Sequence, residues 1–75
     1  MSAQELYRIY RPYAVELGRK HRVALHDALQ ALARAATQCP SGIEPSAAAQ
    51  FMRERVEAEM AQESAQGGQR RRHVA

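Results

Sequence analysis

The sequence predicts an all-α protein: a helical hairpin with a short, kinked N-terminal helix, paired with a second copy in an assembly like a four-helix bundle. The helices are predicted because apolar residues recur at spacings of three and four, and no stretch alternates as a strand would. The pairing is predicted because fifteen residues are alanine and only twelve are Leu, Ile, Val or Phe. With so little large apolar volume, a chain of 75 residues is expected to need a second subunit.

The first helix is expected over residues 3–11. Ser2 and Glu5 match a capping box, in which a hydroxyl and a carboxylate each satisfy a free amide at a helix start. Pro12 lacks an amide proton and clashes with the carbonyl four residues back, so the chain should kink or break near Arg11. Pro12 would then be the first residue of the next helix.

The second helix is expected over residues 13–38, where the apolar spacing is most regular. Gly18 costs about 1 kcal/mol relative to Ala inside a helix, which allows a second bend there. Residues 39–45 contain two prolines and a glycine, which predicts a loop in which the chain reverses. Ile43 of this loop is expected to turn toward the core.

The third helix is expected over residues 46–65, with Ser46 as its cap and Ser41 with Glu44 as a competing capping box. The pair Gly67 and Gly68 should end it. We therefore predict one helical domain over residues 1–66 and a disordered basic tail over residues 67–75.

A hairpin of this kind leaves an apolar ridge uncovered, and two hairpins joined about a twofold axis would bury it. The residues predicted for this core or dimer interface are Leu17, Leu25, Leu29, Leu32, Met52, Val56 and Met60. The architecture resembles that of small plasmid and phage regulators built as helical-hairpin dimers. Ten arginines against one lysine, with abundant alanine, are typical of a GC-rich bacterium or its phages.

Tyrosines and arginines are concentrated near the amino terminus, and these are the residue types most enriched at binding hot spots. The residues predicted to contact a partner are Tyr7, Arg8, Tyr10, Arg11 and Tyr13. We therefore predict a non-enzymatic protein-binding module, an inhibitor or adaptor that occupies a surface of a larger host or cognate protein.

Nucleic-acid binding is the alternative, because arginines on one side of a helix can pair with phosphates while tyrosines stack. The net charge is +3, and residues 67–75 contain three arginines and no acid. The candidate phosphate contacts are Arg8, Arg11, Arg19, Lys20, Arg22, Arg70, Arg71 and Arg72. A helix-turn-helix around Gly42 is a weak match, because its recognition helix would display glutamates that phosphates repel.

No spacing in the chain predicts a catalytic residue, a cofactor or a metal. His21 and His26 are five apart, whereas two ligands on one helical face need a spacing of three or four. Composition leaves open an intersubunit helical enzyme such as the all-helical chorismate mutases, but no spacing favours it. A single cysteine, Cys39, and the lack of a signal-like amino terminus lead us to expect a cytoplasmic protein. No apolar run is long enough for a membrane span.

Overall fold

Three helices make up the described chain. A computed structural model describes the backbone of residues 2–74 and the side chains of residues 2–65. It contains α1 (Ala3–Lys20), α2 (Leu25–Gln38) and α3 (Pro45–Val74), and no strand among the residues whose backbone is described. The prediction of an all-α protein is confirmed.

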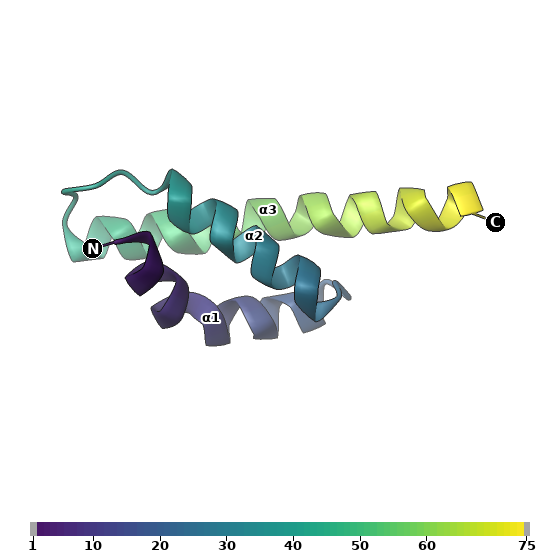
Figure 1. The fold of residues 1–75 in the computed structure, drawn as a ribbon, viewed down its shortest axis with the longest axis horizontal. Helices are drawn as coiled ribbons and strands as arrows, with labels where there is room; N and C mark the ends of the chain where they lie inside the picture. The colour runs from purple at the N-terminus through teal and green to yellow at the C-terminus, as the bar shows by residue number, and fades with distance from the viewer. Residues whose placement is uncertain (1, 75) are drawn as a thin grey trace.

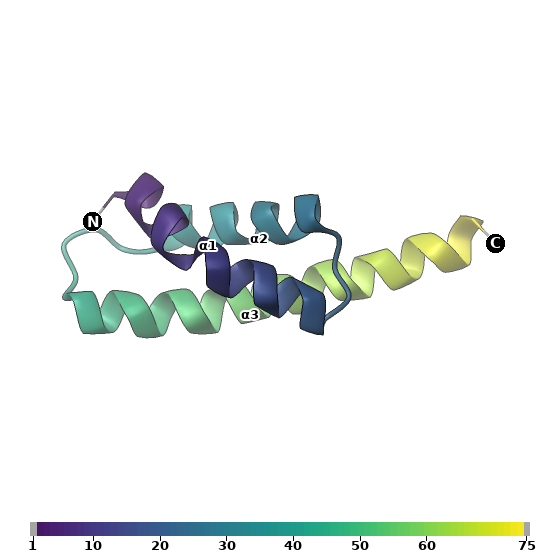
Figure 2. The same ribbon diagram turned by 90° about the horizontal axis from the view of Figure 1, so that it is seen from below.

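The helices run in alternating directions, with α2 antiparallel to α1 and α3 (Figure 1). α1 lies across the hairpin of α2 and α3, as the view from that side shows (Figure 2). α3 extends beyond the other two helices and sets the long axis of a molecule that measures 46 × 18 × 17 Å. The apolar ridge that we expected a second copy to cover is therefore covered largely by α1.

α1 begins as expected but does not end at the proline. The Glu5 backbone N–H donates to the Ser2 side-chain oxygen at 3.2 Å, so Ser2 caps the helix. The predicted break near Arg11 is wrong, because α1 continues through Pro12 to Lys20. Pro12 is exposed, so the carbonyl left without its helical partner lies on the side open to water, and the helix bends instead of breaking (Figure 1).

The break between the first two helices lies at residues 21–24, inside the predicted helix 13–38. Arg22 has a φ of 56°, the left-handed conformation that favours glycine. Its N–H donates to the Arg19 carbonyl at 3.2 Å, and the Val23 N–H donates to the Gly18 carbonyl at 2.8 Å. These two bonds form a Schellman motif, with Val23 packed against the core as its apolar contact. The sequence did not indicate this ending, because arginine occupies the position usually taken by glycine.

The loop and the start of α3 differ by one residue from the prediction. Gly42 has a φ of 78° and turns the chain, and Ile43 is half-buried against the core as expected. α3 begins at Pro45 instead of following a Ser46 cap. Proline suits the first helical position because its missing N–H would have had no helical partner there, and the Ala48 N–H already bonds to the Glu44 carbonyl at 2.9 Å.

The far end of α3 also differs from the prediction. The helix was expected to end near residue 65, but its backbone continues through Gly67 and Gly68 to Val74. Each glycine weakens a helix by about 1 kcal/mol relative to alanine without blocking its hydrogen bonds, and the Gln and Arg residues that follow are good helix formers. Over residues 67–74 the backbone is thus helical, whereas we predicted a disordered tail. The side chains of Arg70, Arg71 and Arg72 lie outside the described residues.

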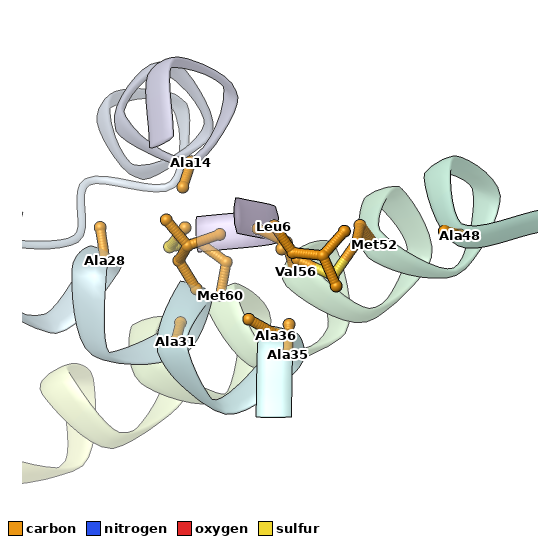
Figure 3. Close-up of a cluster of buried hydrophobic side chains, with 11 residues drawn as sticks. Leu6, Ala14, Ala28, Ala31, Ala35, Ala36, Ala48, Met52, Val56 and Met60 are labelled. Atoms are coloured by element: carbon orange, nitrogen blue, oxygen red, sulfur yellow. The ribbon is translucent and has the colours of Figure 1, made fainter. Parts of the chain in front are cut away.

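The core lies between the three helices and consists mostly of small side chains (Figure 3). Six of its eleven buried apolar residues are alanines. These let α1 and α2 approach so closely that a Cβ atom added to Gly18 would lie 2.9 Å from the Cβ of Ala28. Close approach compensates for the scarcity of large side chains, because it keeps the packing dense.

The residues predicted for a core or dimer interface take different positions within the single chain. Four are fully buried by the chain's own helices: Leu32, Met52, Val56 and Met60. Leu17 and Leu29 are half-buried and pack against these. Leu25, at the start of α2, is 57% exposed.

Candidate protein-binding surface

The five predicted partner residues lie on α1, but they do not share one face. Tyr7, Tyr10 and Tyr13 are half-buried and pack against the core. Arg8 and Arg11 are exposed on the outward side of α1. The tyrosines thus serve mainly to hold α1 on the hairpin, and the two arginines are what α1 presents to solvent.

Tyr13 shows this anchoring role most clearly. Burial raises the pKa of its phenol above the ordinary value, and the negative charge of Glu57 raises that pKa further, whereas the positive charge of Arg53 lowers it. Both charged residues belong to α3, so Tyr13 lies on the side of α1 that packs against α3. Only the exposed part of the Tyr13 ring is therefore accessible for the predicted contact with a partner.

One exposed apolar residue on α1 was not singled out from the sequence. Ile9 is 53% exposed, although it lies between residues of a well-packed helix. It lies three residues after Leu6 and four before Tyr13, so the apolar spacing gave no signal that it would be exposed. Ile9 points about 100° away from Arg8 around the helix axis and is a separate apolar contact.

Arg8 and Arg11 are exposed, and neither has an ion-pair partner among residues 2–65. The exposed Arg53 of α3 has none among these residues either. Arg19 lies on the same outward side of α1 but pairs with Glu16 at 3.2 Å. Arg22, another candidate phosphate contact, is not part of α1, because the helix ends at Lys20.

A partly buried ionic cluster joins α2 to α3. The Arg34 guanidinium donates to Glu59 at 3.4 Å and to Glu63 at 2.7 Å, and Gln38 donates to Glu59 at 3.0 Å. Arg55 lies 3.4 Å from Glu59, which is only 4% exposed. Burial raises the pKa of Glu59, but the hydrogen bond from Gln38 and the charges of Arg34 and Arg55 outweigh it, so the pKa is lowered overall. This cluster fixes the two helices to each other.

Cys39 lines a small cavity of about 60 Å³ under the loop. The other residues that line it carry no ionisable side chain: Leu6, Pro40, Gly42, Ile43, Pro45 and Ala48. The half-buried thiol lies 3.8 Å from the Pro40 carbonyl oxygen. In this surrounding Cys39 packs as a small apolar side chain.

A larger groove opens between the start of α1 and the end of α2. Its volume is about 260 Å³. It is lined by residues from the two helices: Ala3, Gln4, Tyr7, Ala33, Ala36 and Thr37. Arg8 and Arg11 are each four residues from a lining residue of α1, so they lie one helical turn along from the groove.

Comparisons with protein-family models, with curated proteins and with solved structures gave no match to this chain. Among the described residues, no three His, Cys, Asp or Glu side chains are grouped so that they could hold a metal ion. None of the helices, as far as they are described, has the length and apolar character needed to cross a lipid bilayer.

Proposed function

We propose that this chain is a non-enzymatic helical protein-binding module, an inhibitor or adaptor that acts by covering a surface of a larger protein. One observation carries the proposal. α1 displays two exposed arginines without an ion-pair partner among residues 2–65 and, on another side of the same helix, an isoleucine that is 53% exposed. The guanidinium groups suit a partner surface that carries carboxylates, and the isoleucine offers a separate apolar contact.

The way α1 is held supports this role. Its three tyrosines pack against the core, so the helix and the two arginines are already in place before binding. A preorganised surface loses less conformational entropy on binding than a flexible segment does. A small regulator from a phage or plasmid of a GC-rich bacterium would fit this composition and size.

The proposal is tested by comparing the proteins retained from a lysate of the source organism. The Arg8→Ala, Arg11→Ala variant is expected to lose the specific partner that the wild-type chain retains. The Arg70→Ala, Arg71→Ala variant removes the same charge from the end of α3 and should still retain it. A partner retained equally by all three proteins would show that α1 is not the binding surface.

Nucleic-acid binding is the second candidate, and one contact favours it. The Ser64 hydroxyl donates to the His21 carbonyl at 3.3 Å, so the turn after α1 lies against α3. Lys20 and Arg22 are exposed at this turn, and α3 continues from here toward Arg70. Lys20 and Arg22 thus lie beside the part of α3 that precedes Arg70.

Salt dependence separates the two candidates. Phosphate contacts make affinity fall steeply with ionic strength, by about 10³ to 10⁵ between 50 and 200 mM salt for six to ten contacts. A gel-shift assay is expected to show no binding, or weak binding that 200 mM salt abolishes. Tight binding of a particular sequence at 200 mM salt would favour the nucleic-acid candidate instead.

Self-association is also a proposal. It now relies on the exposed Leu25, since Leu32, Met52, Val56 and Met60 are buried within one chain. Leu25→Glu should shift a dimer to monomer in sedimentation equilibrium while leaving the helical circular dichroism unchanged. A wild-type chain that sediments as a folded monomer at micromolar concentration would refute the dimer.

A further inference from the structure

The groove between α1 and α2 exists because its walls are made of small residues. Three of the lining residues are alanines, and Tyr7 forms the one large wall. On each helix the lining residues span five positions, a length of about 6 Å or slightly more than one helical turn. At about 260 Å³ the groove is below the roughly 300–1,000 Å³ of small-molecule sites, so it suits one or two side chains of another polypeptide.

The charged residues next to the α1 wall of this groove are two arginines and one glutamate. Arg11 is one helical turn beyond Tyr7 and Arg8 is one turn beyond Gln4, each pointing about 40° from that lining residue, and both arginines are exposed. On α2 the exposed residues near it, Gln30 and Thr37, are uncharged. Glu5 is the acid nearest in sequence, but it points about 160° away from Tyr7 around the helix axis. An occupant with negative charge is therefore favoured.

The spacing of the two arginines indicates what kind of occupant fits. Arg8 and Arg11 are three residues apart, so their Cβ atoms are about 5–6 Å apart. Two acidic residues three or four apart on a facing helix have the same separation, so each could pair with one arginine. A second copy docked about a twofold axis at this groove would instead bring the Arg8 and Arg11 pairs of both copies together, which costs free energy.

We infer that the groove and its two arginines bind an acidic amphipathic helix of the partner protein, with apolar side chains in the groove and carboxylates on Arg8 and Arg11. This inference rests on the proposed function and specifies the partner's chemistry. The binding mode is a helix laid in a groove, with anchors at positions i, i+3 or i+4, and i+7.

Fluorescence anisotropy with three labelled peptides tests the inference. The first peptide is an 18-residue helix of Leu, Glu and Ala with leucines at i, i+4 and i+7; the second has Lys for Glu, and the third has the first composition in scrambled order. The first peptide should bind at 150 mM salt, and the other two at least about tenfold more weakly, as expected when charge or anchor spacing is wrong. Equal binding of the first two would overturn the inference.

Two pairs of variants locate the site. Ala33→Leu should fill the groove and weaken binding of the first peptide at least tenfold, whereas Ala47→Leu, at an exposed position of α3, should not change it. Arg8→Glu, Arg11→Glu should also abolish binding, and Arg70→Glu, Arg71→Glu, with the same change in charge, should not. Circular dichroism confirms that each variant is folded.

The outcomes distinguish this inference from the proposed function. If the arginine variant loses binding but Ala33→Leu does not, the α1 surface binds partners without the groove and only the inference fails. If neither variant changes binding, both fail. Peptide-induced or concentration-dependent dimers in sedimentation would point to a second copy in the groove and would also overturn it.

Discussion

Replacing Gly18 by alanine should destabilise the protein, although alanine is the better helix former. In an exposed helix this change would stabilise by about 1 kcal/mol. Here the new Cβ would lie 2.9 Å from the Cβ of Ala28 and 3.9 Å from the sulfur of Met60. Neither α1 nor α2 can relax without moving the other packed residues, and overpacking of this kind costs about 1–3 kcal/mol. We expect a net loss of about 1 kcal/mol.

The reverse change on α2 makes the prediction specific. Ala28→Gly alone should also cost about 1 kcal/mol, because glycine weakens a helix interior. The double variant Gly18→Ala, Ala28→Gly exchanges the two side chains across the contact, which removes the clash and cancels the two propensity effects. Its free energy of unfolding should therefore be close to that of the wild type.

Urea unfolding followed by circular dichroism measures all four proteins of this cycle. The summed losses of free energy of unfolding in the two single variants should exceed the loss in the double variant by about 2 kcal/mol. A coupling of this size is expected only for residues in contact. If the losses add, so that the double variant is about 2 kcal/mol less stable, α1 and α2 do not approach each other at Gly18. A Gly18→Ala variant that is more stable than the wild type would refute the reasoning directly.

Three further predictions concern the ends of the helices and the ionic cluster. Arg22→Gly should raise the free energy of unfolding by about 1 kcal/mol, because a left-handed residue with a Cβ costs about 1–2 kcal/mol; unchanged stability in urea unfolding would argue against the Schellman ending. The pKa of Glu59 is lower in the folded chain than its ordinary 4.5. The ionised carboxylate therefore stabilises the folded chain above that pH, and this stabilisation is lost as the pH falls through the folded pKa. Glu59→Gln should therefore destabilise the chain by about 1–3 kcal/mol at pH 7 and flatten the fall in stability as the pH is lowered below 4.5; a variant with the wild-type acid profile would contradict this. Amide exchange should be slower at residues 52–60 than at residues 67–74, since packing in the core protects only the first segment; equal protection would show that the end of α3 is stabilised by contacts of its own.

The candidate site was only partly predictable from the sequence. The concentration of Tyr and Arg near the amino terminus correctly drew attention to α1, but spacing alone did not separate the anchoring tyrosines from the exposed arginines. Arg34 and Glu59 are 25 residues apart, so nothing local indicated that they would pair or that Glu59 would be buried. The groove likewise depends on where the ends of two helices lie in space, which no sequence pattern records.

The sequence by itself determined the helices, because apolar spacing and a serine cap act over three or four residues. Only the tertiary structure decided where the first two helices part and what covers the hairpin. Pro12 remains within α1 on its exposed side, where the Arg8 carbonyl that lacks a helical partner is open to water, and Arg22 ends the helix because Val23 gains a packed position in the core. The helix propensity of a single residue contributes about 1 kcal/mol, which is outweighed when a different path of the chain buries more apolar surface. How much surface is buried depends on residues far apart in the sequence, so it cannot be read from local spacing.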